Sequence, residues 1–344
     1  MSLTTKLTKT VLLPLIFAVG SASQCYSQIK YDYPPTGKLV DAGGHLLHLV
    51  VMGKGKPTVV FENGSGDFSF IWELIQPEIS KITTTVAYDR GGYAWSEEGP
   101  LPRSGRQLAY ELHTALHNAG IDGPYIMVGQ SYGGFLVRSF ARFYKKDVVG
   151  LVLVDALNED SKIIIDHKPV RIRDWAKGEH APEPQNMVKK NIDSSLSAEK
   201  SKVVLDTTIE PPLDKLPLSI QKLQVWAQSQ PVYRKAGGNE MNWSPEDVAD
   251  MYTNRGKTDY LLGDIPLVVL SRGEGGYSGM PDSAALENER VKLQIELTHL
   301  STNSKIIFDK KSGHNIHLED PALVIDAIKQ VINAYKTHGR LKVD

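Results

Sequence analysis

The chain has 344 residues, of which 41% are hydrophobic and 23% charged, as in soluble globular proteins, and this length allows one large domain with an insertion or two ordinary domains. Its 39 basic side chains nearly cancel its 40 acidic ones, so the formal net charge is −1. No basic surplus therefore favours a nucleic-acid partner, and no acidic tract indicates a disordered tail.

The first residues have the pattern of a secretory signal peptide, which we predict over residues 1–27. Two lysines precede the apolar stretch 11–19, and small and polar residues follow it. This stretch is shorter than the ~20 residues of a membrane-spanning helix, so we expect an exported protein, periplasmic or secreted, without stable membrane insertion. Cleavage after Ser23 or after Ser27 fits equally well. The second site would remove Cys25, the only cysteine, and with it any possible disulfide.

Residues 34–157 predict the first part of an α/β core. After a β-hairpin over 38–51, buried strands alternate with amphipathic helices. The predicted strands are 58–61, 84–88, 125–128 and 148–154, and the predicted helices are 70–79, 108–119 and 135–141. Strands that are apolar on both faces and alternate with helices indicate a parallel sheet covered on both sides.

The alternation breaks down over residues 158–260, where no buried strand is predicted. The sequence instead gives short helical patterns at 218–228 and 244–253, the second with Ser244 as N-cap and Pro245 at the first helical position. We therefore predict an aromatic-rich helical lid inserted into the sheet domain.

Residues 261–344 resume the alternation and complete the predicted core. Their strands are 266–270 and 305–308, and their helices are 293–300 and 324–335. The lid thus separates two segments of one α/β domain.

The pentapeptide Gly129-Gln130-Ser131-Tyr132-Gly133 lies where a predicted strand gives way to a helix. The pattern G-x-S-x-G in this context is that of a nucleophile elbow, whose tight turn strains the serine backbone and presents its hydroxyl at the sheet edge. Small residues two positions away keep neighbouring Cβ atoms from clashing. The motif alone is weak, because a glycine-rich turn before a helix has the same pattern.

A catalytic serine needs a base, which in this type of scaffold is a histidine late in the chain. His314 follows the strand 305–308 and a short loop, and we predict that it is the general base. His317 is predicted to pack against or cap the last helix rather than to share a metal with His314, because no further ligands lie nearby in sequence.

Two carboxylates could orient that histidine. Asp155 ends the strand 148–154, and Glu274 lies in a glycine-rich loop after the strand 266–270. We prefer Asp155, because a rigid strand end positions a side chain better than such a loop. The oxyanion hole is predicted from the backbone amides of Tyr132 and Ser65, which follow the elbow and the strand 58–61.

These blocks together resemble the α/β-hydrolase superfamily. The resemblance covers nearly all of the chain from Lys38 to His338 except the lid, and it rests on Glu62-Asn63-Gly64-Ser65-Gly66, Tyr88-Asp89-Arg90-Gly91-Gly92-Tyr93-Ala94-Trp95-Ser96, Gly129-Gln130-Ser131-Tyr132-Gly133-Gly134, Leu151-Val152-Leu153-Val154-Asp155 and Gly313-His314-Asn315-Ile316-His317-Leu318-Glu319-Asp320-Pro321. It implies an eight-stranded, mostly parallel sheet with helices on both faces, an inserted helical cap and no cofactor.

A serine at the elbow is similar to that of the superfamily's esterases, lipases, lactonases and proline-type aminopeptidases. Two departures stand out: Asn63 replaces a common histidine before the oxyanion glycine, and the usual G-x-x-D after the strand 266–270 is missing. Some members carry the acid after the strand that corresponds to 148–154, which favours Asp155.

We therefore expect an exported serine hydrolase that cleaves a carboxylic ester, or a related acyl bond, of a small molecule through an acyl-enzyme. Ser131 would attack, His314 would transfer the proton, and Asp155 or Glu274 would orient the histidine. The alternatives are an aminopeptidase or amidase acting on small peptides, and a non-catalytic ligand-binding protein on the same scaffold.

Overall fold

The computed structural model describes residues 33–187, 208–258, 260–273 and 275–342. The predicted signal peptide therefore lies outside the described residues. Residues 35–344 group into one compact unit. In the described ranges, every helix is too short or too polar to cross a membrane.

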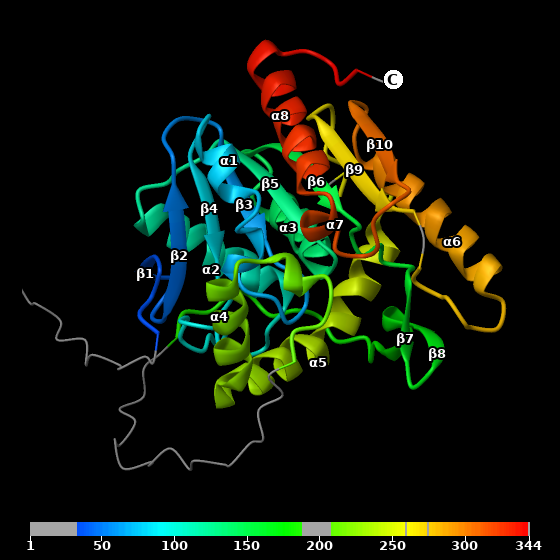
Figure 1. The fold of residues 1–344 in the computed structure, drawn as a ribbon, viewed down its shortest axis with the longest axis horizontal. Coiled ribbons are helices and arrows are strands. Elements are labelled where there is room, and N and C mark those ends of the chain that lie inside the picture. Colours follow the sequence, from blue (N-terminus) through cyan, green and yellow to red (C-terminus); the bar gives the residue numbers. More distant parts are fainter. Residues whose placement is uncertain (1–32, 188–207, 259, 274, 343–344) are drawn as a thin grey trace, which may run out of the picture. The chain divides into compact units, whose positions relative to one another are not determined.

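Eight strands form one sheet in the order β1-β2-β4-β3-β5-β6-β9-β10 (Figure 1). Their bounds are β1 (Lys38–Asp41), β2 (Leu46–Met52), β3 (Thr58–Glu62), β4 (Thr85–Tyr88), β5 (Tyr125–Gln130), β6 (Val148–Val154), β9 (Leu267–Arg272) and β10 (Ser304–Asp309). Strand β2 is antiparallel to β1 and β4, and the other neighbouring pairs are parallel. The predicted eight-stranded, mostly parallel fold is confirmed.

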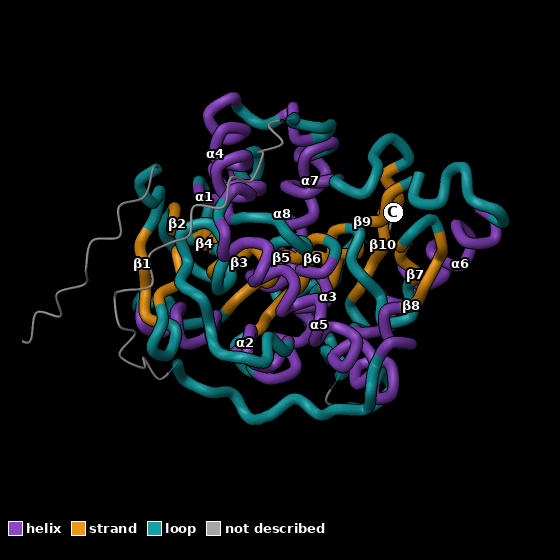
Figure 2. The backbone as a smooth tube through the Cα atoms, turned by 90° about the horizontal axis from the view of Figure 1, so that it is seen from below, coloured by secondary structure: helices purple, strands orange, loops and turns teal. Residues whose placement is uncertain are grey.

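Helices cover both faces of this sheet (Figure 2). One apolar core lies between the sheet and α2 (Gly105–Asn118) with α3 (Tyr132–Phe143). A second core lies between the opposite face and α1 (Gln76–Ser80) with α8 (Pro321–Thr337). The inner strands β3, β4, β5, β6 and β9 are buried on both faces because these two cores enclose them, as their apolar runs predicted.

The single helix predicted over residues 70–79 is wrong. The structure has a 3₁₀ turn, η1 (Ser69–Trp72), and then the short helix α1. Pro77 lies in the first turn of α1, and its missing backbone N–H cannot continue a helix that began earlier. The apolar spacing was read correctly, since Ile71, Ile75 and Ile79 all reach the core.

The predicted helix start at Ser244-Pro245 is also wrong, because α5 runs without a break from Pro231 to Asn254. A proline inside a helix removes the donor for the carbonyl four residues earlier, here that of Met241. The Ser244 hydroxyl donates to this carbonyl at 3.2 Å, so the helix keeps its direction without an orphaned acceptor.

The predicted lid region also contains elements that the sequence did not indicate. A hairpin of two partly exposed strands, β7 (Lys162–Ile165) and β8 (Lys168–Arg171), comes before the helices α4 (Leu218–Ser229) and α5. Near the chain's end lie α6 (Ser283–Glu296) and the short α7 (Ile316–Glu319). The lid boundaries 158 and 260, and the core segments on either side, stay a prediction.

Candidate active site

Ser131 lies in the turn between β5 and α3 with φ 54° and ψ −121°, a conformation that a residue with a side chain rarely adopts. The surrounding hydrogen bonds hold this turn. The Ser131 N–H donates to the Val154 carbonyl at 3.1 Å, and the N–H groups of Gly134 and Leu157 donate to the Ser131 carbonyl at 3.0 and 2.9 Å. The elbow predicted from G-x-S-x-G thus has the backbone geometry of that motif.

Gly133 explains why the elbow and the loop after β3 lie so close together. A Cβ atom at this position would lie 2.5 Å from the carbonyl oxygens of both Glu62 and Asn63, closer than non-bonded atoms allow. The glycine therefore lets the first turn of α3 rest on the end of β3. This contact brings the amides after both strands to one place.

His314 meets Asp155, the preferred acid of the sequence analysis. The Nδ1 atom of His314 lies 2.6 Å from Oδ2 of Asp155, 159 positions apart in the chain. If Nδ1 carries the proton, Nε2 is left free to act as a base. His314 and Ser131 line the same cavity of about 350 Å³, although the described residues include no direct hydrogen bond between them. The alternative acid, Glu274, lies outside the described residues.

Asp155 is held in an environment that favours its charged form. Its side chain is 2% exposed, and it accepts hydrogen bonds from the Arg272 amide at 3.2 Å and the Arg272 guanidinium at 2.6 Å. Burial alone would raise the pKa of Asp155, but the hydrogen bond from His314 and the charge of Arg272 outweigh it and lower that pKa below its usual range. Asp155 is therefore an ionised partner for the imidazole.

The two amides predicted for the oxyanion hole are unengaged: neither the Ser65 nor the Tyr132 N–H donates to another described residue. Arg90 fixes the loop that carries Ser65. Its guanidinium donates to the carbonyls of Asn63 at 2.8 Å and Gly64 at 2.9 Å. Because these carbonyls point to Arg90, the amides of the same turn are free to face the other way.

Arg90 also connects this loop to the helix α5. It is fully buried between two carboxylates, Glu62 at 2.9 Å and Glu240 of α5 at 2.9 Å. Tyr88 and Tyr93 donate hydrogen bonds to Glu62 and Glu240, respectively. Burial raises the pKa of Glu62 despite the nearby arginine. The loop that carries Ser65 thus rests on a buried ionic cluster that includes α5.

Asp67 is a further carboxylate at the end of the oxyanion loop. Burial raises its pKa to about 6, although the charges of Arg90 and His314 act in the opposite direction. The Asp67 carboxyl is therefore a further titratable group beside the loop that carries Ser65.

Two other histidines are excluded as the base by their burial. His317 is fully buried against Trp72, with ring centroids 5.1 Å apart, and burial lowers its pKa to about 3. It packs, as predicted. His48 pairs with Asp89 at 2.7 Å but is also fully buried, and its other ring nitrogen accepts the Gly37 N–H at 2.8 Å. Neither imidazole can reach a substrate.

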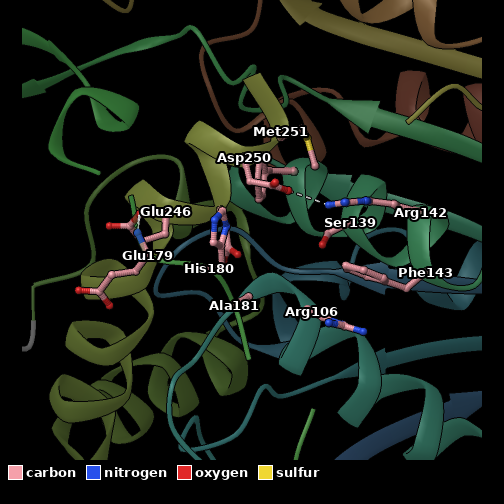
Figure 3. A pocket seen from close by; sticks show the side chains of 12 residues that line it. Arg106, Ser139, Arg142, Phe143, Glu179, His180, Ala181, Glu246, Asp250 and Met251 are labelled. Atoms are coloured by element: carbon pink, nitrogen blue, oxygen red, sulfur yellow. Dashed lines mark hydrogen bonds and ion pairs between the residues drawn. The ribbon is translucent and has the colours of Figure 1, made fainter. Parts of the chain in front are cut away.

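A second cavity, of about 150 Å³, lies between α2, α3, α5 and residues 179–181 (Figure 3). Several of its charged side chains already have partners. Arg142 pairs with Asp250 at 2.7 Å, and Glu246 accepts the backbone N–H groups of Lys177, Gly178 and Glu179. This cavity is a junction that holds the segment after β8 against α5. Within the described ranges, no group of three or more His, Cys, Asp or Glu side chains is placed to hold a metal.

The sequence analysis missed three residues that shape the site. Arg90 lies just after β4, and Arg272 ends β9. A position at the end of a buried strand is a usable signal, but the partners of both residues are distant in sequence. Gln130 stands in the variable position before the elbow serine, and its Nε2 donates to the His314 carbonyl at 3.3 Å. It connects the nucleophile turn directly to the loop that carries the histidine.

Comparisons with known proteins agree with this architecture. Residues 57–183 match the family model of the alpha/beta hydrolase fold. The chain is 26% identical over 316 residues to "Probable transporter efuK" of Hormonema carpetanum, covering 87% of this chain but 43% of that protein. It is 27% identical to the uncharacterized protein YqjL of Bacillus subtilis, covering 81% and 85% of the two chains. A thermophilic esterase from Thermogutta terrifontis superposes with a TM-score of 0.56 at 18% identity, over 87% and 98% of the two chains.

The chain therefore has the alpha/beta hydrolase fold, and the resemblance derived from its sequence blocks is confirmed at the level of this fold. At 18% sequence identity, the similarity to that esterase shows a shared fold but not a shared reaction. A hydrolytic function agrees with this fold, but the fold does not determine the reaction, which depends on the side chains of the site.

Proposed function

We propose that the protein is a serine hydrolase that cleaves carboxylic esters through an acyl-enzyme. The observation that carries this proposal is the 2.6 Å contact between His314 and the buried carboxylate of Asp155, in a cavity that Ser131 also lines. A nucleophile, a base and an ionised orienting group thus follow three adjacent or nearby strands at one edge of the sheet.

The reaction would proceed in two halves. The Ser131 hydroxyl attacks the ester carbonyl carbon and passes its proton to Nε2 of His314, while Asp155 stabilises the imidazolium that forms. The amides of Ser65 and Tyr132 donate to the developing oxyanion. His314 then returns the proton to the leaving alcohol, and a water molecule activated by the same histidine releases the acid and regenerates Ser131.

The test is covalent labelling with a fluorophosphonate, followed by hydrolysis of p-nitrophenyl esters. Ser161 supplies a matched control, because it lines the same cavity but accepts a hydrogen bond from the Asn158 amide and faces no histidine–carboxylate pair in the described contacts. We expect labelling and turnover in the wild type and in Ser161→Ala, and neither in Ser131→Ala. Equal labelling of the two variants would refute the proposal.

Aminoacyl anilides measured beside the esters distinguish an esterase from an aminopeptidase or amidase. A protein that is neither labelled nor active would be the ligand-binding alternative. Export also remains part of the proposal, and sequencing the amino terminus of the mature protein tests it: a start at residue 24 or 28 agrees with signal cleavage, and an intact Met1 contradicts it.

A further inference from the structure

The cavity beside Ser131 has an uneven distribution of charge. Its wall is largely apolar, and its charged lining consists of three cations and one carboxylate, namely Lys162, Arg272, Arg290 and Asp155. Glu289, which pairs with Lys162, and Glu287, which pairs with Arg290, do not line it, whereas Asp155, 3.5 Å from Arg290, does. Among the described residues that line the cavity, cations therefore outnumber carboxylates.

The three cations differ in how many of their N–H donors are already used in hydrogen bonds. Lys162 donates to Glu289 at 2.6 Å. Arg290 is nearly saturated, since its guanidinium donates to Glu287, to the Ser271 hydroxyl and to the Arg272 carbonyl at 2.9–3.0 Å. Arg290 therefore has little left to donate, whereas Lys162 keeps further N–H donors but has its charge matched by Glu289.

Arg272 is different. Its Nη1 donates to Asp155 at 2.6 Å, but its Nη2 donates to no described residue, and its Nε is buried without a partner. A guanidinium carries five N–H donors and accepts none, so Arg272 retains donors that the protein does not use. The planar arrangement of these donors matches the two oxygens of a carboxylate.

The position of Arg272 relates this free donor to the reaction. The same oxygen of Asp155 contacts both Arg272 Nη1 and His314 Nδ1, each at 2.6 Å. Ser131 and Arg272 line the same cavity, so an acyl chain attached at Ser131 enters the space that Arg272 borders. The apolar wall of this cavity is formed by Ala156, Leu157, Ile163, Ile164 and Tyr277.

We propose that the cavity takes acyl groups with a terminal carboxylate, and that Arg272 Nη2 binds this carboxylate. The preferred substrates would be half-esters of short dicarboxylic acids, whose methylenes lie on the apolar wall. This inference rests on the proposed function, because it names the acyl group of the ester that Ser131 attacks.

The test compares mono-p-nitrophenyl adipate with its neutral match, the p-nitrophenyl methyl diester of adipic acid, after subtraction of the uncatalysed rates. We expect the wild type to favour the half-ester by about tenfold or more in kcat/KM, in line with a charged hydrogen bond. Arg272→Gln lowers turnover of both substrates, because Asp155 loses a partner, but it abolishes the preference. A charge-matched control is Arg171→Gln, which removes a cation next to Glu289 but outside the cavity lining and should retain the preference.

A wild type without preference, or an Arg272→Gln variant that slows both esters by the same factor, would overturn the inference. Calorimetric binding of monomethyl adipate to Ser131→Ala separates this result from a failure of the proposed function, because binding needs no turnover. If the protein hydrolyses no ester but binds this half-ester only while Arg272 is present, the anion site stands and the catalytic proposal falls. If esters are cleaved and no half-ester binds, only the anion site is refuted.

Discussion

The buried pair of Arg90 and Glu240 should contribute strongly to stability, although it connects segments 150 positions apart. The side chains are 1% and 3% exposed, and Arg90 reaches both oxygens of Glu240, at 2.9 and 3.2 Å. Removing one partner of a buried pair costs about 3–5 kcal/mol, because the other charge is left without compensation. We expect about 3 kcal/mol for Glu240→Ala, at the low end, since Glu62 still pairs with Arg90.

The same helix offers a matched control. Lys235 of α5 pairs with Glu98 at 2.9 Å, but the two side chains are 62% and 39% exposed. An exposed pair contributes about 0–1 kcal/mol. Alanine is the best helix former, so helix propensity destabilises neither variant. In a chain of this size about 1 kcal/mol shifts Tm by roughly 2 °C, so we expect a fall of about 6 °C for Glu240→Ala and at most about 2 °C for Lys235→Ala.

Thermal and urea unfolding measure both variants, and a double-mutant cycle isolates the pair. Arg90→Met and Glu240→Ala should combine to less than the sum of their separate effects by about 2 kcal/mol, because the double variant leaves no unpaired charge between these two positions. Similar Tm shifts in Glu240→Ala and Lys235→Ala would refute this reasoning. Additivity of the two substitutions within about 0.5 kcal/mol would do so as well.

Two further expectations concern histidines. His317 is neutral in the folded state, where burial lowers its pKa to about 3 from 6.5, so its contribution to stability is present above pH 6.5 and is lost as the pH falls towards 3. Between pH 7 and 4.5 this loss amounts to about 2.5 kcal/mol of the free energy of unfolding. In urea unfolding, the stability of His317→Leu should therefore fall less with acid than that of the wild type. Parallel plots of stability against pH for the two proteins would contradict this expectation. Replacing the acid that orients His314 should lower kcat about 10⁴-fold. Ester turnover should therefore be nearly lost in Asp155→Asn and remain near the wild-type rate in Glu274→Gln. The reverse result would identify Glu274 as the acid.

Much of the fold could be predicted from sequence because its signals are local. Each buried strand is a continuous apolar run, and the helix α2 carries its apolar face at regular spacing after an N-capping serine, Ser104. The predicted site residues followed from the same logic, since Ser131, Asp155 and His314 come directly or shortly after predicted strands. The parallel sheet then brings these ends to one edge. Local order in the sequence was sufficient for this part.

The lid was harder, because its structure depends on contacts that no short window contains. Ser244-Pro245 has the composition of a helix start, yet α5 passes through it, since the serine hydroxyl supplies the hydrogen bond that the proline lacks. The half of α5 before Pro245 is also held to the core by the pair of Glu240 with Arg90, a residue 150 positions away. Periodicity alone could not predict such a contact.

The charges around the site show the same division between local and distant information. The near-zero net charge of the chain gives no sign of an anionic ligand. In a sum of charges along the sequence, the acidic partners of Lys162 and Arg290 cancel the charges of these two cations. In the folded protein Glu289 and Glu287 do not line the cavity, whereas Lys162 and Arg290 do. The positions of candidate catalytic side chains can thus be encoded at strand ends. The charge of a binding cavity depends instead on which distant side chains pair with one another in the folded protein.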